Sequence, residues 1–531
     1  MKYTKKMKNK SNYLLLSAFL GGLLFSYLFW QERLALNLLV YSLYILTVTC
    51  FNPDIIKNTK FKIYAAAHVA AAILVVINNS DLTLCSYYIS LLAFVGFSHY
   101  EQIRTVFAAG LAALFQLMTV PVNVLLSLST VSIGRFNLKP VLTLTKFVFL
   151  PAVIVSFFTI IYSAANNVFA HYMERLIINA GEFFADLLRF FFGGIELARI
   201  AHFSLGLLLT AGLLYTFINR SLEKKEMQYG EDLERQRKTR NKSSILHEII
   251  QTFTGNLLSR KLALKTEYTT GVISFIALNC LLLVVNTIDI STLWFGYKPE
   301  GNFSADLHQG TNALIFSIIM AMAVILYFFR GNLNFYGRSN TLRLLAYTWM
   351  VQNFILIISV LIRDGYYIEF YGLTHKRIGV LVFALLCIIG LATVYIKISR
   401  QKTLFYLFKI NGSIWFALLI AFSTINWDVF IVKYNIRHAD SIAVDADYLL
   451  SLSDKTLPFL AKNRNKLEMT DNHAADARGI DGANSKDELQ EHLNKRIGYF
   501  WERYEKKSWV SWNLQDWNTA KQLSEYKKVA Q

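Results

Sequence analysis

The sequence contains a series of apolar runs, each long enough to form a helix that crosses a lipid bilayer. The first, "YLLLSAFLGGLLFSYLFW", covers Tyr13 to Trp30. A helix needs about 20 apolar residues to cross roughly 30 Å of hydrocarbon. Further runs fall near 34–51, 61–78, 82–98, 105–128, 141–163, 201–219, 268–288, 311–329, 344–362, 377–397 and 411–431. Backbone polar groups in lipid must pair internally, so we predict an all-α, polytopic bundle of eleven or twelve transmembrane helices.

Composition agrees with this class. Charged residues make up 17% of the chain, against about 25% in soluble domains. The basic start resembles a secretory signal, but the first apolar run is too long and lacks a small-residue cleavage site, so we interpret it as a retained span. The four cysteines lie within apolar runs without metal-ligand spacing, which favours packing over metal or redox chemistry. The net charge of +18 lies mainly in loops beside the spans, which favours contact with anionic lipid headgroups over nucleic acid.

The most basic connection gives the orientation. Residues 220–265 hold eleven Lys and Arg and should be cytoplasmic by the positive-inside rule. Counting five spans forward places the C-terminus outside, and the basic start places the N-terminus inside. We therefore expect four parts: membrane helices in 1–219, a basic cytoplasmic loop in 220–267 that could bind a cytoplasmic protein, five spans in 268–431, and an extracytoplasmic α-helical tail in 432–531.

The N-terminal part contains one apolar segment too many for this orientation. The segment at 105–128 contains Pro121 between basic flanks, so it could be a re-entrant or bent hairpin. The alternative is an extra crossing within 165–200. That segment carries seven charged residues, too many for a lipid-facing span, and is better interpreted as an amphipathic interfacial helix pair.

The tail shows helical patterns of its own. A short helix is expected to end near Pro458, and Ser485 with Glu488 forms a capping-box pattern. Apolar residues then recur at helical spacing: Leu489, Leu493, Ile497, Phe500 and Tyr504, followed by Trp509, Trp512 and Trp517. Two interpretations are open: docking on the membrane surface or the bundle, or packing in the core of a small domain.

No motif indicates a catalytic, cofactor or metal site. The chain contains neither GxxxxGK[ST] nor a complete zinc-protease helix, and no framed serine or cysteine nucleophile. Polar residues in or beside the late spans are therefore the candidates for ligand or anion contact. They are Arg330, Arg338, Asn340, Arg343, Gln352, Asn353, Asp364, Glu369 and Asp428.

These candidates have different expected roles. Arg330–Arg343 is interpreted as a cytoplasmic turn facing anionic headgroups, with Asn340 able to start the next helix. Gln352 and Asn353, together with Asn279 and Asn286, can hydrogen-bond between helices or line a polar cavity. Asp364 and Glu369 are interpreted as part of an interfacial belt of tyrosines and charges between two spans, and the alternative is that they are the acids of a membrane transferase. Asp428 lies near the outer boundary of the last span.

Several strings resemble a known bacterial group: "YSAANNVFAHYMERL" (162–176), the stretch 330–380 with "YGLTHKR", and "NWDVFIVKYNI" followed by "DADYLLSLSDKTLPFL". They are similar to multi-pass membrane proteins of the domains of unknown function numbered four-one-five-three and four-one-seven-three. The resemblance implies a bacterial cytoplasmic membrane, no established activity and no site residues to transfer.

Two functions are expected. The first is a non-enzymatic envelope sensor or scaffold, in which the tail perceives the envelope and loop 220–267 contacts a cytoplasmic partner. The second is a transporter or lipid flippase with a polar cavity between the late spans. An enzyme, with Asp364 or Glu369 near a second polar group, is a third hypothesis.

Overall fold

The computed structural model describes residues 2–51, 53–56, 58–128, 132–133, 136–137, 151, 154–156, 158–160, 162–163, 166–192, 196–214, 221–234, 264–295, 303–329, 332–442, 446–467 and 486–526. The chain forms two compact units. The first contains Met1–Met227, Leu419–Thr424 and Glu505–Trp517, and the second contains Gln228–Leu418, Ile425–Tyr504 and Asn518–Gln531.

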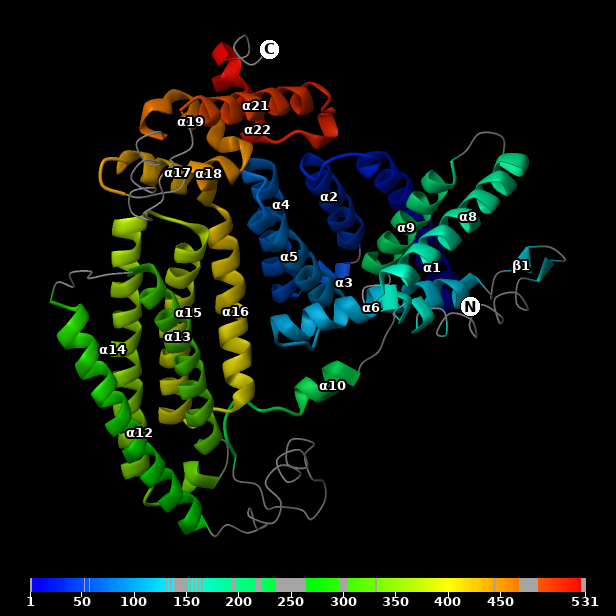
Figure 1. The fold of residues 1–531 in the computed structure, drawn as a ribbon. Coiled ribbons are helices and arrows are strands. Elements are labelled where there is room, and N and C mark those ends of the chain that lie inside the picture. Colours follow the sequence, from blue (N-terminus) through cyan, green and yellow to red (C-terminus); the bar gives the residue numbers. More distant parts are fainter. Residues whose placement is uncertain are drawn as a thin grey trace. The chain divides into compact units, whose positions relative to one another are not determined.

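The first unit is built from helices of the N-terminal half (Figure 1). They are α1 (Lys2–Phe29), α2 (Leu36–Cys50), α3 (Pro53–Ile56), α4 (Thr59–Asn78), α5 (Asp81–His99), α6 (Val106–Leu128), α8 (Asn167–Phe192), α9 (Leu197–Leu214) and α10 (Ser221–Met227). Two-residue strands β1 (Ser132–Ile133) and β2 (Phe136–Asn137) pair antiparallel. α1 packs on α9, α4 on α2 and α5, and α6 on α5 and α9.

Glycine permits the closest of these approaches. A Cβ atom on Gly96 of α5 would lie 2.2 Å from the backbone oxygen of Ala109 in α6. A Cβ atom on Gly206 of α9 would lie 2.5 Å from the ring of Phe25 in α1. Small residues let membrane helices approach in this way and strengthen their van der Waals contact.

Two carboxylates of helix α10 accept hydrogen bonds from backbone N–H groups and a hydroxyl just before the start of α6. Glu223 accepts a hydrogen bond from the backbone N–H of Gln102 at 3.2 Å, and Glu226 accepts from the N–H of Arg104 and from the hydroxyl of Thr105. Negative charge is stabilising at a helix N-terminus. This part of the basic connection is therefore folded onto the membrane helices.

The second unit contains the later helices. They are α12 (Leu264–Leu293), α13 (Phe303–Phe328), η2 (Asn332–Phe335), α14 (Asn340–Tyr371), α15 (His375–Ser399), most of α16 (Leu404–Ser423), α17 (Trp427–Arg437), α18 (Ala446–Ser451), η3 (Asp454–Thr456), α19 (Leu457–Lys462) and α21 (Lys486–Glu505). After the short η4 (Trp509–Ser511), α22 (Leu514–Leu523) and η5 (Ser524–Tyr526) follow. Helix α14 packs against α12, α13 and α15 (Figure 1).

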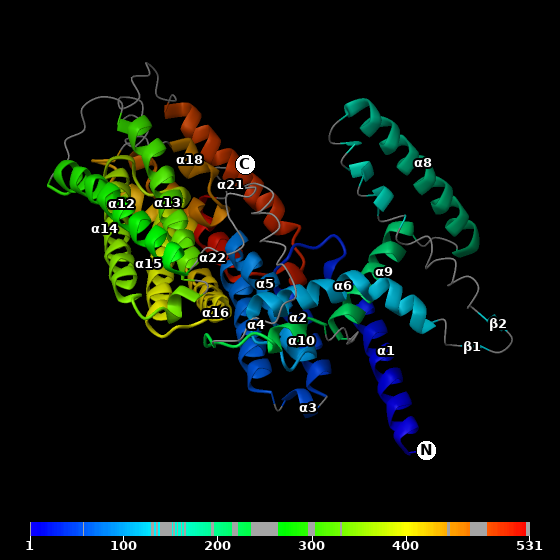
Figure 2. The ribbon, with the colours of Figure 1, turned by 90° about the horizontal axis from the view of Figure 1, so that it is seen from below.

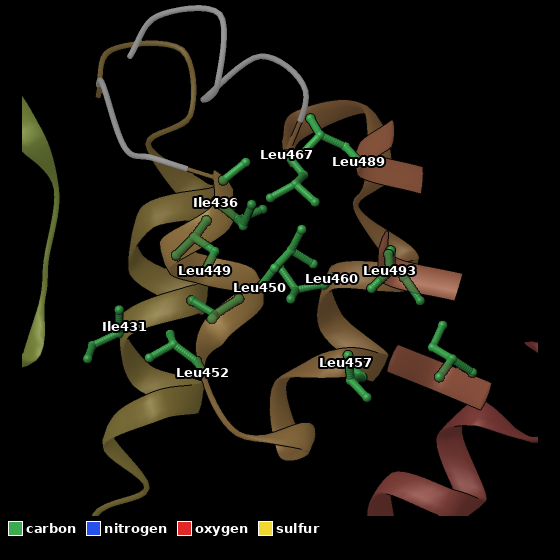
Figure 3. Close-up of a cluster of buried hydrophobic side chains, with 14 of the residues drawn as sticks. Ile431, Ile436, Leu449, Leu450, Leu452, Leu457, Leu460, Leu467, Leu489 and Leu493 are labelled. Carbon is green, nitrogen blue, oxygen red and sulfur yellow. The ribbon is translucent and has the colours of Figure 1, made fainter. Parts of the chain in front are cut away.

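Helices α17, α18, α19 and α21 form a domain with its own apolar core, which we call the C-terminal helical domain. Figure 3 shows leucines and isoleucines of these helices pointing toward one another. Leu449, Leu457, Leu460 and Ile497 are fully buried there, and Leu523 of α22 joins them. The apolar face of α21 is thus buried in the core of this domain. Trp509, Trp512 and Trp517, in contrast, are exposed.

The structure confirms the all-α helix bundle and its multi-pass membrane character. Six described helices are long and apolar enough to cross a membrane, namely α4, α5, α12, α14, α15 and α16. Five shorter apolar stretches lie in α1, α2, α6, α9 and α13. Most of the expected span at 141–163 lies outside the described residues.

Two expectations about the N-terminal half need correction. The segment at 106–128 is one helix that contains Pro121, and not a bent hairpin. The segment at 165–200 holds one long helix, α8, rather than a helix pair, and α9 already begins at Leu197. Helix α8 lies at the edge of its unit (Figure 2), and many of its large apolar side chains are exposed.

The last span and the tail differ from the sequence prediction as well. The span expected at 411–431 begins at Leu404 and ends at Ser423. Lys409 can lie inside it because the carboxylate of Glu231 is 2.7 Å from its ammonium. Asn426 then caps a separate helix, α17, with its side chain. Pro458 lies in the first turn of α19, which begins at Leu457, and does not end a helix. Proline is tolerated there because the N–H groups of the first turn have no partner within the helix.

Candidate functional site: the junction of α14, α15 and the C-terminal helical domain

The turn between α14 and α15 is short and rigidly defined. Gly372 ends α14 with φ of 74°, a conformation that favours glycine. Thr374 then caps α15, since its side chain accepts from the N–H of Arg377 at 3.5 Å. The motif "YGLT" thus encodes one helix end, one linking residue and one helix start.

Asn435 of α17 fastens this turn to the C-terminal helical domain. Its side-chain oxygen accepts from the N–H of Leu373 at 2.6 Å, and its amide nitrogen donates to the carbonyl of Leu373 at 2.8 Å. Asn435 is fully buried. A single side chain therefore satisfies both backbone groups of the linking residue, which would otherwise be unpaired away from water.

Asp428 joins three segments. Its carboxylate lies 2.7 Å from Nε2 of His375 at the start of α15, and the hydroxyl of Ser453 donates to its second oxygen. The N–H of His375 donates to the hydroxyl of Tyr448 at 3.0 Å. Burial alone would raise the pKa of Asp428, but the hydrogen bonds from His375 and Ser453 outweigh it and lower the pKa to about 2. The carboxylate is therefore charged at neutral pH and holds α15, α17 and η3 together.

Arg377 closes the end of α14 from the other side. Its guanidinium donates to the carbonyls of Tyr371 and Gly372 and lies over the ring of Tyr367, 4.6 Å from the centroid. A cation at a helix C-terminus is stabilised by the helix dipole and its free carbonyls. Asp364 is buried nearby and interacts electrostatically with Arg377. Its Oδ2 has no hydrogen-bond partner among the described residues.

A ladder of polar contacts joins α12 to α14. Asn279 donates to the carbonyl of Leu345, and Asn286 donates to the carbonyl of Gln352. In both pairs the partners are 66 residues apart in the sequence, and the second pair lies seven residues after the first in each helix. Gln352 donates to the side chain of Asn279 at 2.9 Å. This spacing is that of two parallel helices in heptad register. Asn279, Asn286 and Gln352 thus form hydrogen bonds between α12 and α14.

The ladder ends beside the junction. Arg363 of α14 forms an ion pair with Asp289 of α12 at 2.5 Å. Asn353 instead donates to Trp349, four residues earlier in its own helix. Glu369 is exposed, and five residues of helix place it on a different face from Asp364. The structure thus brings Asp364 and Asp428 to the junction but not Glu369.

The arginine-rich turn lies at the opposite end of α14, a helix of roughly 48 Å at 1.5 Å per residue. Arg330 lies outside the described residues. Arg343 donates to the carbonyl of Asn334 at 2.9 Å, and Arg338 is exposed. The N–H of Ser339 donates to Tyr336, so one donor flanking Arg338 is already in use. Asn340 is the first residue of α14 and not its cap, because Ser339 holds the cap position.

Sequence reasoning missed two buried basic side chains. Lys397 does not reach outward to solvent; its ammonium is buried and donates to the carbonyl of Phe329 at 2.7 Å. His68 lies in the middle of α4 and is buried. Its two ring nitrogens contact the hydroxyls of Ser90 and Ser42 at 2.9 and 3.1 Å. The serines within the apolar runs of α2 and α5, Ser42 and Ser90, were the sequence feature that could have indicated polar partners for a buried His68.

Asn435 and Arg377 were also missed as junction residues, although both lie in strings that carry the family resemblance. "YGLTHKR", "NWDVFIVKYNI" and "DADYLLSLSD" are far apart in the sequence but meet at this junction through Leu373, Asp428, Asn435 and Ser453. What these strings share is therefore a structural contact, which is invisible to motif searches that look for catalytic spacing.

Comparison with known proteins gives a family but no activity. The family model of a domain of unknown function, DUF4153, matches residues 59–463, which is well over half of the 531 residues. No curated protein and no solved structure matches the chain. The matched range contains every residue of the junction. The chain is an integral, multi-pass membrane protein and belongs to the DUF4153 family.

Proposed function

We propose that this protein is a non-enzymatic sensor or scaffold of the bacterial envelope, embedded in the cytoplasmic membrane. The observation that carries the proposal is the junction. Its conspicuous polar groups, Asn435, Asp428 and Arg377, each bind backbone or side chains of neighbouring segments. Such an arrangement transmits position and force between the C-terminal helical domain and helices α14 and α15.

The other end of α15 supports the same proposal. The segment 230–233 pairs with 401–403: the N–H of Leu233 donates to the carbonyl of Gln401, and that of Thr403 to the carbonyl of Glu231. An ion pair joins Asp232 to Lys402. Helix α15 thus connects the junction at its first residue to the basic connection just after its last. A displacement of the helical domain could be passed along α15 to that connection.

We further propose the orientation in which the basic connection 220–267 is cytoplasmic and the C-terminal helical domain is extracytoplasmic. The eleven Lys and Arg of 220–265 support it. In this orientation the connection contacts a cytoplasmic protein partner, and the helical domain faces the envelope. The membrane lipids, with their anionic headgroups, are partners of the basic loops.

The test is complementation of a deletion strain profiled for lipids and envelope polymers. Asn435→Leu should fail to complement at matched protein levels, because it detaches the helical domain from the turn. Asn463→Leu is the matched control, since the side chain of Asn463 donates to the carbonyl of Phe459, four residues earlier in the same segment. Full complementation by Asn435→Leu would contradict coupling through the junction.

A transporter or lipid flippase is the second candidate. It is supported by Oδ1 of Asn286 and Oε1 of Gln352, which are buried between α12 and α14 and have no hydrogen-bond partner among the described residues. Such acceptors could face a polar substrate. Purified protein in proteoliposomes should then move a fluorescent lipid between leaflets, and Gln352→Leu should slow it. The absence of any flux above protein-free vesicles would leave the sensor proposal.

A further inference from the structure

The segment Glu505–Trp517 of the first unit, which we call the tryptophan turn, exposes three large aromatic side chains. Trp509, Trp512 and Trp517 are 59%, 38% and 43% exposed. Three residues between these tryptophans, Val510, Ser511 and Asn513, are buried. The turn therefore has one face fixed to protein and another that presents indole rings outward.

The buried face is bound to the ends of α1 and α2. Ser511 accepts from the N–H of Arg33 at 2.8 Å and donates to the carboxylate of Glu32 at 2.6 Å. The carbonyl of Trp512 accepts from the N–H of Leu36, the first residue of α2, at 3.2 Å. Val510 packs with the apolar core of this unit. The position of the turn is thus set by the ends of these two apolar helices.

The ends of α4 and α16 are connected to the tryptophan turn by hydrogen bonds. Gln515 donates to Asn78, the last residue of α4, at 3.5 Å. Asn78 in turn donates to the carbonyls of Ser423 and Thr424, where α16 ends, at 2.8 and 3.0 Å. Both α4 and α16 are 20-residue candidate spans, about the length that crosses the hydrocarbon. A helix of that length ends at the membrane boundary, so the tryptophan turn lies at that boundary.

We propose that Trp509, Trp512 and Trp517 insert into the headgroup region of the bilayer that surrounds the helices, and so anchor the tail at the membrane surface. Indole combines a large apolar ring with one N–H donor, and it is enriched where one end of a side chain is apolar and the other wet. The ion pair of Lys507 with Asp516 next to the rings leaves this surface without a strong net charge, so the anchor does not depend on anionic lipid. The inference is independent of the proposed sensor role.

The test uses the full chain in nanodiscs of zwitterionic lipid. Tryptophan fluorescence is compared between the wild type and the variant Trp509→Phe/Trp512→Phe/Trp517→Phe, with and without lipids that carry bromine near the headgroup end of the acyl chain. The difference between the two proteins reports only the three rings. Trp501→Phe is the control, because Trp501 packs against the core of the C-terminal helical domain.

We expect the difference signal of the three rings to be quenched several-fold more strongly by brominated lipid than the signal lost in Trp501→Phe. Equal quenching of both signals would overturn the proposal. So would a difference signal that brominated lipid leaves unchanged but aqueous iodide quenches, and a protein partner would then be the occupant of this surface. If the triple variant does not fold, the three single variants give the same comparison one ring at a time.

Discussion

Replacing Asn435 by leucine should release the α14–α15 turn from the C-terminal helical domain. Leucine keeps the branching and the number of heavy atoms of asparagine but leaves the N–H and the carbonyl of Leu373 without the partners they have at 2.6 and 2.8 Å. A buried backbone group left unpaired costs roughly 1–3 kcal/mol. Two such groups cost at least about 2 kcal/mol, which corresponds to roughly a 30-fold increase in the population of the open turn.

Hydrogen–deuterium exchange on the protein in nanodiscs measures this opening. The amide of Leu373 loses its own acceptor, so faster exchange there is uninformative. The amides of Gly372 and Ile378 keep their acceptors, the carbonyls of Ile368 and Thr374. Their exchange should still accelerate by about 30-fold or more, because they are exposed only when the whole turn opens.

The amides of Gly372 and Ile378 also provide the control and the result that would refute the reasoning. Asn463→Leu removes an amide of the same domain that donates to Phe459, and it should leave exchange at Gly372 and Ile378 unchanged. If Asn435→Leu also leaves these two amides unchanged, the turn is held by other contacts. The reasoning that assigns the coupling to Asn435 would then be wrong.

Further predictions test other parts of the structure. The pKa of Asp428 is lowered to about 2 in the folded protein, below its ordinary value, so its stabilisation is present above pH 4 and lost as the pH falls toward 2. The difference in exchange at the turn between wild type and Asp428→Asn should therefore shrink over that range, and a constant difference would refute the assignment. Lys397→Met removes a buried charge while Asn334 still donates to the carbonyl of Phe329. Thermal stability should thus stay equal or rise, and a marked loss would contradict this. Single cysteines at Ser243 and Asn484, in a background without the native cysteines, should be labelled from opposite sides of the membrane; labelling from one side would refute the orientation. Arg338→Lys should complement fully if the arginine only orients the protein, whereas failure at matched protein levels would indicate a bidentate phosphate contact.

The sequence by itself determined the class of protein and much of its local structure. Apolar runs near the length of the bilayer can only be helices, because lipid offers no partner for backbone groups. The amide side chains of Asn279 and Asn286 within an apolar run favoured hydrogen bonds between helices, and the structure contains such bonds. The apolar stripe of α21 likewise predicted a helix with a buried face.

Helix ends were harder to predict, because they depend on contacts that are distant in sequence. Lys409 lies within α16 because Glu231, 178 residues away, neutralises it. A prediction from hydropathy counts Lys409 as an isolated charge, so it placed the start of the span at residue 411, seven residues after the start of α16 at Leu404. The burial of His68 likewise depends on contacts distant in sequence, because its ring nitrogens contact hydroxyls of two other helices.

Only the tertiary structure decided where the candidate site lies. Leu373, Asp428, Asn435 and Ser453 are separated by up to 80 residues, and no local pattern indicates that they meet. A hydrogen bond between a side chain and a distant backbone group leaves no periodic signal, because it needs one residue type at one position. Apolar burial acts on every turn of a helix and can be read locally, whereas the polar contacts that fasten one element to another are set by how the whole chain packs.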